Sequence, residues 1–563
     1  MNLSNFLKEK YWMIVVLLLL ALFMQAIFSS SHKSLTADES GYIYSGYYYF
    51  KTHDFRLNND HPPLVKLLFA LPLIIFNYNM PILPPRYFDS TLKLHLFMNL
   101  AVATDPDTEQ IVFLARLVAT LLAIALGMLI FIWAKRLYGL NAGLLSLFLY
   151  CFCPDILANS GLATPDIGLA FFFFLASFCF FRYINRPDWK NLIISGVTMG
   201  LALSTKITSL LILPLSLALG IFGVLTGHKC VDGKCNRNYK LTIPGFLLSF
   251  LLILIIATVT LNAVYFFKQP FQPLGTFSFL KKYHPQLLLS PFRNLMLPLP
   301  KEYINAIFGT IRHLNQGHNA FLMQQFSRQG WWYYYLLAFV IKTTLPALIL
   351  SALSLFFIKK QGKLDIRNEI FLLLPILFFF LVLSVFKSVN IGLRYILPIY
   401  PFLYIFISGL SVQRLSRKRL GRIAIVILCA WHLYSSASIY PHYLSYFNEL
   451  VGGAKNGHKF LIDSNLEVGQ DFKYLKDYMD NHGIKKIKLF NATGINPHFY
   501  GIDYELLRED NLKGGYIAVG VSTVMMLRAG LKATDRRNKV IDWIDSHTPI
   551  DKINYSILIY KGD

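Results

Sequence analysis

Long uninterrupted apolar runs constrain this chain more than any other feature. Two examples are "MIVVLLLLALFMQAIF" at 13–28 and "FLLSFLLILIIATVTL" at 246–261. A run of about 20 apolar residues is long enough to cross a lipid bilayer as a helix. Charged residues make up only 15% of the chain, against about 25% in soluble proteins. The sequence therefore predicts a polytopic α-helical membrane protein.

The positive charge of the chain predicts how these runs cross the membrane. The formal net charge is +23, and in a membrane protein basic residues gather in cytoplasmic loops, so nucleic-acid binding is not indicated. The basic segments are "LKEK", "AKRLYG", "FRYINRPDWK", "HKCVDGKCNRNYK", "KKQGKLDIRNE" and "VQRLSRKRLGR". Placing all of them inside gives about eleven transmembrane helices, a cytoplasmic N-terminus and an extracytoplasmic C-terminus. Cys230 and Cys235 could be half of a metal site or a small disulfide loop, but their place in a cytoplasmic turn favours free thiols.

Composition divides the chain into two regions. Residues 1–440 form the predicted transmembrane domain, and residues 441–563 form a small extracytoplasmic α/β domain with alternating strand-like and amphipathic segments. The first outer segment, 29–110, contains "LVKLLFALPLIIF", which at about 13 apolar residues is too short to span and is typical of a juxtamembrane or re-entrant helix.

Several charged residues are predicted to meet at the outer membrane face. Asp38 and Glu39 follow the first span, and Asp166 begins another span. Lys206, Arg394 and Arg116 lie at or near outer span ends. Charged groups near lipid are costly and are mostly functional. A carboxylate can take a proton from an acceptor hydroxyl, and cations can hold the phosphate of a lipid-linked donor.

Structural roles remain open for the acids and the neighbouring tyrosines. Asp38 or Glu39 could cap the helix that follows them, and Asp166 could serve the same purpose after Thr164–Pro165. The tyrosines between these motifs are typical of an interfacial aromatic belt, with sugar stacking as the alternative: Tyr42, Tyr44, Tyr47, Tyr48 and Tyr49.

Structural roles also remain open for the basic residues. Lys206 could extend its amine to the lipid headgroups. Arg116 could form a local ion pair with Glu109. His61 could be a structural histidine rather than a ligand. A second acidic group, made of Asp463, Glu467 and Asp471, favours turn and helix-capping roles over a second site.

Two motifs of the first outer segment resemble those of the protein O-mannosyltransferases. These are "ADES" at 37–40 and "NDHPPLVKLL" at 59–68. The segments "FLARLVATLLA", "LATPD" and "GLALSTK" are similar to the wider C-type glycosyltransferase superfamily, which includes the lipid A aminoarabinose transferases. "GWWYYYLLAFVIKTTLPALIL" and "VNIGLRYILPIYPFLYIF" resemble the bacterial branch of the mannosyltransferase-like group.

This resemblance implies an inverting transfer of mannose or another hexose from a polyprenyl-phosphate donor, at the outer face of a bacterial inner membrane. It implies Asp38 as the base, with Glu39 beside it and Asp166 as the second acidic position. The implied donor phosphate-binding residues are Lys206, Arg394, Arg116, His61 and Lys66. The inserted β-trefoil of the eukaryotic enzymes is missing from the pattern, which leaves the acceptor open. A divalent metal ion remains an option, although no His/Cys cluster lies near Asp38 and no metal ligands are assigned.

Different functions remain open beside this one. The favoured acceptor is a protein Ser/Thr hydroxyl, and the alternative is a lipid or cell-envelope glycan. A transporter or flippase of lipid-linked sugars would carry inverted repeats and interrupted helices at the bilayer midplane, and the sequence indicates neither. A non-catalytic scaffold presenting the C-terminal domain is the third class. Membrane lipid is a partner in each case, and the sequence indicates no oligomeric state.

Overall fold

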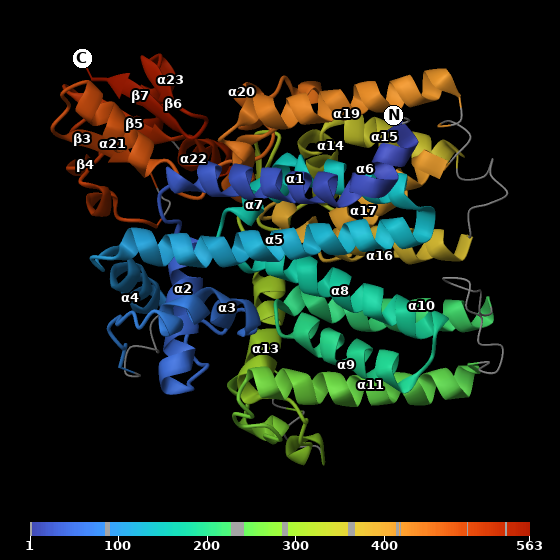
Figure 1. Ribbon diagram of the computed structural model, residues 1–563. Helices are drawn as coiled ribbons and strands as arrows, with labels where there is room; N and C mark the ends of the chain where they lie inside the picture. The colour runs from blue at the N-terminus through green and yellow to red at the C-terminus, as the bar shows by residue number, and fades with distance from the viewer. Residues whose placement is uncertain are drawn as a thin grey trace.

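A computed structural model describes residues 3–84, 91–226, 241–283, 286, 291–357, 366–412, 416, 418–491, 494–534 and 538–562. Cys230 and Cys235 lie outside these residues, as do residues 359–365 of the basic segment 359–369. Helices running in a common direction dominate the molecule, and a small sheet lies at one end of the bundle (Figure 1). The predicted fold class, a helical membrane protein with a C-terminal α/β region, is confirmed.

In the described part of the chain, seven helices are long and apolar enough to cross a membrane. They are α1 (Leu3–Ser31), α5 (Thr108–Tyr138), α8 (Pro165–Asn185), α10 (Ile212–Leu225) with the preceding 3-10 turn η2 (Ile207–Leu211), α11 (Ile243–Val264), α16 (Ile366–Val385) and α19 (Arg419–Ile439). Two bent pairs raise the number to nine. They are α6 (Leu140–Cys151) with α7 (Pro154–Ser160), bent by 65°, and α14 (Tyr334–Lys342) with α15 (Leu345–Phe357), bent by 112°.

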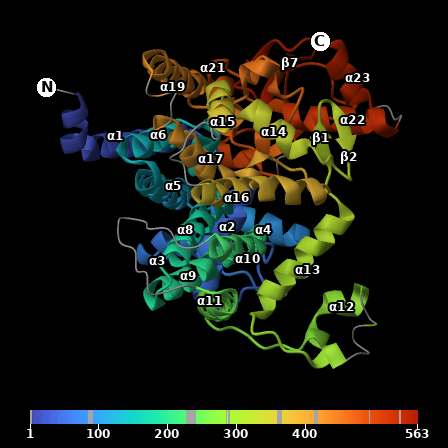
Figure 2. The same ribbon diagram turned by 90° about the vertical axis from the view of Figure 1, so that its right-hand side faces the viewer.

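Two shorter apolar helices lie beside these spans. They are α9 (Trp189–Leu203), which packs between α8 and α11, and α17 (Ile399–Ser408), which packs against α6 and α16 (Figures 1 and 2). Length and composition thus assign seven to nine spans among the described residues, and the count of about eleven stays a prediction.

Small residues allow close helix packing on the α9 side of the bundle. Gly196 and Gly200 are four residues apart, so both face α11. A Cβ on Gly196 would lie 2.6 Å from the Cβ of Ile256, and one on Gly200 would lie 2.5 Å from the Ala257 carbonyl oxygen. Close packing of this kind replaces the hydrophobic driving force that lipid does not supply between helices.

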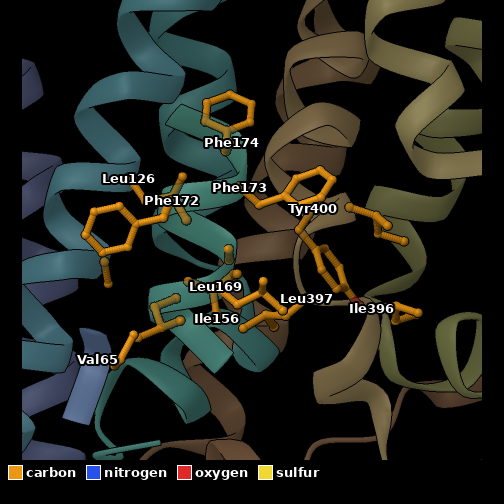
Figure 3. Packing of buried hydrophobic residues seen from close by; sticks show 14 of the residues in the cluster. Val65, Leu126, Ile156, Leu169, Phe172, Phe173, Phe174, Ile396, Leu397 and Tyr400 are labelled. Carbon is orange, nitrogen blue, oxygen red and sulfur yellow. The ribbon is translucent and has the colours of Figure 1, made fainter. Parts of the chain in front are cut away.

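The centre of the bundle is filled by aromatic side chains of α8. Phe173 and Phe174 point toward α17, where Phe402 contacts both rings edge-on at 6.5 and 4.9 Å between ring centroids. Figure 3 shows this packing, with Tyr400 of α17 beside Phe173 and Ile156 of α7 near Leu169. The beginning of α8, which carries Asp166, therefore lies on a rigid apolar support.

Three helices of the first outer segment pack against one end of the bundle. They are α2 (Ala37–Thr52), α3 (Leu64–Ile75) and α4 (Thr91–Ala103). The expectation of an interfacial tyrosine belt on α2 is wrong for most of its members. Four of these side chains are at most 2% exposed, because α3 and α4 cover the helix: Tyr44, Tyr47, Tyr48 and Tyr49.

The segment between α11 and α14 and the C-terminal region complete the fold. The former contains α12 (Ser278–Tyr283), α13 (Lys301–Gln316), β1 (Ala320–Leu322) and β2 (Gln325–Ser327). The latter forms a mixed sheet of order β4-β3-β5-β7-β6, made of β3 (Ile487–Phe490), β4 (Tyr504–Leu506), β5 (Tyr516–Gly520), β6 (Asp551–Ile553) and β7 (Ile557–Lys561). The short α20 (Ala454–Gly457) precedes it, and α21 (Phe472–Asn481), α22 (Val521–Thr534) and α23 (Lys539–Ser546) accompany it.

Packing divides the C-terminal region in two. Tyr443, Phe447 and Leu466 belong to the apolar cluster of the helical bundle, whereas the cluster under the sheet begins at Phe472. The domain boundary at residue 440/441 stays a prediction, and the segment that follows it is built into the bundle.

A substitution at Gly46 tests how closely α2 must approach α3. A Cβ there would lie 1.9 Å from the Lys66 carbonyl oxygen. Because backbone atoms cannot yield as a flexible side chain does, we expect Gly46→Ala to reduce the free energy of unfolding by about 1–3 kcal/mol.

Thermal unfolding in detergent measures this effect. Gly309→Ala on α13 is the matched control, because nothing lies within 4 Å of its added Cβ and Ala favours a helix over Gly. Equal melting temperatures for Gly46→Ala and Gly309→Ala would contradict the close packing of α2 on α3.

Candidate active site

Two neighbouring acids at the beginning of α2 have different surroundings. The N-cap of α2 is Thr36, whose hydroxyl accepts a hydrogen bond from the Glu39 N–H, while Glu39 Oε2 accepts one from the Thr36 N–H at 3.0 Å. This capping box satisfies the first turn of the helix. Glu39 is fully buried, whereas the Asp38 side chain is 45% exposed. The cap is therefore formed by Thr36 and Glu39, and Asp38 takes no part in it.

Glu39 and Arg116 form a saturated buried ion pair. Arg116 donates to both Glu39 carboxylate oxygens, at 2.8 and 2.7 Å. Its other N–H groups donate to the carbonyl oxygens of Ser30, Lys33 and Ser34 at the end of α1. All five guanidinium donors are thus used. Arg116 was expected to bind the donor phosphate, but this geometry gives it a positioning role instead.

The surroundings of Glu39 hold its carboxylate in the charged form. Burial alone would raise the pKa of Glu39, but the Arg116 charge and hydrogen bonds outweigh this effect and lower the pKa below its ordinary value. The Ala163 N–H also donates to Glu39 at 2.8 Å. The alternative pairing of Arg116 with Glu109 is wrong, because Glu109 lies 2.6 Å from Lys473.

Four other charges form an alternating row beside this pair. Arg394 Nη1 donates to Asp38 Oδ2 at 2.9 Å and lies 4.0 Å from Asp166 Oδ2. Lys206 Nζ donates to Asp166 Oδ1 at 2.7 Å. Arg394 comes from the 3-10 turn η7 (Leu393–Ile396), and Lys206 directly precedes η2. The structure thus brings together four predicted site residues from four distant segments.

The row combines an accessible acid with a buried one. The Asp166 and Lys206 side chains are 1% and 3% exposed, which rules out the alternative of a lysine extended to the lipid headgroups. The Lys206 amine also lies 4.3 Å from the centre of the Tyr395 ring, a cation–π contact. Among the described residues, Asp166 Oδ2 and Thr164 Oγ1 have no hydrogen-bond partner. Asp166 is paired rather than acting as an N-cap, since α8 has no side-chain cap.

Arg394 keeps most of its donors available. Only its Nη1 donates to a carboxylate, and its buried Nε–H has no hydrogen-bond partner in the part of the chain that the structure describes. Burial lowers the pKa of Arg394, but Asp38 and then Asp166 more than offset this effect, so the pKa lies well above its ordinary value. Arg394 is therefore a permanent cation with free N–H groups between two carboxylates.

His61 and Lys66 differ in what they can offer a ligand. Lys66 Nζ donates to the carbonyl oxygens of Asn58 and His61, the second at 2.8 Å, so it fixes the loop before α3. Burial lowers the pKa of Lys66 to about 7. Burial, followed by the charges of Lys206, Lys66 and Arg394, lowers the pKa of His61 well below its ordinary value, which keeps its imidazole neutral.

The sequence interpretation missed Asp463 as a neighbour of this row. The turn η11 (Asp463–Asn465) packs against η7, which carries Arg394. Burial raises the pKa of Asp463, while the Arg394 charge lowers it and the Asp38 charge raises it. Glu467 instead accepts from the Ser522 N–H at 3.1 Å, and Asp471 accepts from Asn554 and Ser556. Glu467 and Asp471 therefore anchor the C-terminal sheet. No local pattern distinguished Asp463 from them.

In the described residues, no group of three or more His, Cys, Asp or Glu side chains could hold a metal ion. The site instead consists of carboxylates and cations in alternation.

One segment of the chain matches a known protein family. Residues 95–261 match the family model described as dolichyl-phosphate-mannose-protein mannosyltransferase. The resemblance inferred from the sequence is confirmed over this segment. It contains Arg116, Asp166 and Lys206, whereas Asp38 and Arg394 lie outside it. No curated protein sequence matches the chain.

Solved membrane glycosyltransferases are similar to the chain at low identity. ArnT from Cupriavidus metallidurans bound to undecaprenyl phosphate is 12% identical, with 98% of each chain covered and a TM-score of 0.49. The Archaeoglobus fulgidus oligosaccharyltransferase is 13% identical over 92% of this chain and 71% of its own, with a TM-score of 0.47. The S. cerevisiae Pmt1-Pmt2 complex bound to the sugar donor is 18% identical over 46% of this chain and 33% of its own, with a TM-score of 0.34.

Removing Arg116 tests whether the Glu39 pair stabilises the site. Arg116→Met leaves Glu39 buried without its cation, so we expect a loss of about 3–5 kcal/mol in the free energy of unfolding. Glu109→Gln on the same helix breaks only the exposed pair with Lys473, so we expect a change of about 0–1 kcal/mol. Thermal unfolding at neutral pH compares the two variants. Equal losses of stability would contradict a stabilising role of the Glu39–Arg116 pair.

The Glu39–Arg116 pair also predicts how the stability of the protein changes with pH. Because the folded pKa of Glu39 is lowered, its stabilising effect is present above the ordinary carboxyl pKa of about 4.3 and disappears as the pH falls below that value. Melting temperatures measured from pH 7 down to about pH 2 should therefore fall by a larger amount for the wild type than for Arg116→Met, with most of the difference arising below about pH 4.3. An equal fall in melting temperature for both proteins would show that another group causes the pH dependence.

Proposed function

We propose that this protein is an inverting glycosyltransferase that moves a sugar from a polyprenyl-phosphate donor to an acceptor hydroxyl. The observation that carries this proposal is the row Asp38–Arg394–Asp166–Lys206, which begins with an accessible carboxylate and ends with a buried cation. The row forms where the first turns of α2 and α8 meet η7 and the residue before η2. The neighbouring apolar helices suit a polyprenyl chain.

The proposed reaction assigns a role to each group. Asp38 takes the proton of the acceptor hydroxyl, whose oxygen then attacks the anomeric carbon of the sugar. The bond from this carbon to the phosphate oxygen breaks on the opposite face, and the phosphate leaves with the electron pair and one further negative charge. The free N–H groups of Arg394 and the amine of Lys206 stabilise that charge. Attack and departure on opposite faces invert the anomeric centre.

Asp166 has a supporting role in this scheme. Its carboxylate touches Lys206 and lies near Arg394, so it orients both cations toward one point. It also offsets their charges in the absence of donor, which makes their burial less costly. Glu39 and Arg116 hold the α2 turn that carries Asp38.

The description of the matched family supports a dolichyl-phosphate type of donor, a mannosyl group and a protein acceptor. We accordingly propose mannose or another hexose as the sugar and a Ser/Thr hydroxyl of an extracytoplasmic protein as the acceptor. A lipid or cell-envelope glycan acceptor is the alternative, which an assay offering both acceptors distinguishes. The proposed location is the bacterial inner membrane, with the site and the C-terminal region facing outward.

Asp38→Asn tests the assignment of the base. Because Asn cannot accept the proton, we expect transfer from polyprenyl-phosphate mannose to a Ser/Thr peptide to fall by about 10²–10⁴-fold. Donor binding should remain, since the cations are intact. Asp107→Asn, an exposed acid at the N-terminus of α5, is the control and should retain full activity. Undiminished turnover by Asp38→Asn would eliminate Asp38 as the base.

Arg394→Lys tests the stabilisation of the leaving phosphate. Lysine keeps the charge but replaces the planar group by a single point of contact. We expect kcat to fall by about 100-fold, with the melting temperature close to that of the wild type. Arg328→Lys, at an exposed guanidinium that donates to Asn319, is the control. A wild-type kcat for Arg394→Lys would exclude a contact specific to the guanidinium.

A further inference from the structure

Hydrogen bonds join the segment that carries Asp463 to the residues that precede Arg394. Asn465 Oδ1 accepts from the Leu393 N–H at 2.9 Å, and Ser464 Oγ donates to the Ile391 carbonyl oxygen at 3.3 Å. Gly392 allows this contact, because a Cβ there would lie 2.3 Å from Ser464 Oγ. The segment that carries Asp463 is thus bonded to the residues directly before Arg394.

A buried lysine fixes this segment from the opposite side. Lys342, at the bend between α14 and α15, donates to the carbonyl oxygens of Asn465 and Leu444, both at 2.7 Å. Its amine also lies 3.8 Å from Asp155 Oδ1. The Lys342 side chain is only 1% exposed, and its amine has three partners. The segment 444–465 is therefore bound firmly to the helical bundle.

The backbone of Asp463 has a positive φ, and hydrogen bonds fix its turn. Its φ is +58°, in the left-handed region that only Gly, Asn and Asp adopt readily. Its carbonyl oxygen accepts from the Leu466 and Glu467 N–H groups, and its Oδ1 accepts from its neighbour Ser464 at 2.6 Å. The turn that carries Asp463 packs against η7, which carries Arg394, and the charges of Arg394 and Asp38 both act on its carboxyl.

We infer that Asp463 binds hydroxyl groups of the sugar that is transferred, as a specificity-determining residue contributed by the C-terminal segment. This inference rests on the proposed function. In that scheme Arg394 contacts the phosphate, and the sugar attached to it lies between the phosphate and Asp38. A carboxyl on the turn that packs against the segment of Arg394 is therefore near the sugar ring in this scheme. A carboxylate accepts hydrogen bonds from two hydroxyls and has nothing to offer the apolar lipid tail.

Asp463→Asn is a suitable variant, because Asn also tolerates a positive φ. Its effect is measured as the affinity of the purified full-length protein, in nanodiscs, for two probes: undecaprenyl phosphate and undecaprenyl-phosphate mannose. We expect Asp463→Asn to bind undecaprenyl phosphate within twofold of the wild type and undecaprenyl-phosphate mannose about tenfold more weakly. The KM for the sugar donor should rise with a smaller change in kcat.

Glu467→Gln is the matched control, since it removes a buried carboxyl four residues further along the same segment. Burial raises the pKa of Glu467 to about 7, so its neutral form is already accessible near neutral pH and Gln should be tolerated. The control should bind both probes like the wild type.

Three outcomes would overturn the inference. If Asp463→Asn binds both probes as the wild type does, Asp463 makes no contact with the sugar. If it loses affinity for both probes equally, Asp463 only positions Arg394. If the wild-type protein binds neither probe, the proposed function itself fails, and the inference fails with it.

Discussion

The buried pair of Glu39 and Arg116 is the interaction on which the site depends. Arg116 gathers three carbonyl oxygens at the end of α1, and Glu39 joins them to the cap of α2 and to the Ala163 N–H just before α8. One ion pair therefore fixes the end of the first span, the turn that carries Asp38 and the loop that leads to Asp166. A buried pair of this kind is costly unless every donor is satisfied, and here all five guanidinium donors are. The adjacent acids Glu39 and Asp38 can consequently take different roles. Glu39 is fully bonded within the turn, whereas Asp38 stays accessible.

The four charges of the row are balanced without a ligand, and this balance has a chemical consequence. Two carboxylates and two cations alternate along Asp38, Arg394, Asp166 and Lys206, with three of the side chains at most 18% exposed. Because the local dielectric is low, the adjacent carboxylates stabilise each cation in place of water. A phosphate that gains negative charge while Asp38 is neutralised by a proton leaves the total charge of the site unchanged. The proposed reaction therefore moves charge along the row without adding any to a buried region.

Much of the architecture could be predicted from the sequence because it depends on local patterns. Apolar runs identify the spans, and the motifs around Asp38 and His61 identify the outer segment. The partners could not be predicted, because they are set by tertiary packing. Arg116 pairs with Glu39, 77 residues away, rather than with nearby Glu109. The tyrosines of α2 looked interfacial because their pattern is that of a belt, yet α3 and α4 bury them. Asp463 was indistinguishable from Glu467 and Asp471 in the sequence. Only the fold shows that the turn of Asp463 packs against the segment of Arg394, whereas Glu467 and Asp471 bond to residues of the C-terminal sheet region.

The segment after the last span explains why the C-terminal region belongs to the site. Residues 443–466 pack in the apolar cluster of the bundle and are held by Lys342 inside it. The same segment contacts the loop of Arg394 through Asn465 and continues into α21, where Ser34 at the end of α1 accepts from the Lys473 N–H at 3.0 Å. A detachable domain would be joined by a flexible linker with few contacts. Here the chain that leads to the sheet also forms one wall around Arg394, so displacement of the sheet would disturb the cation that the proposed chemistry requires.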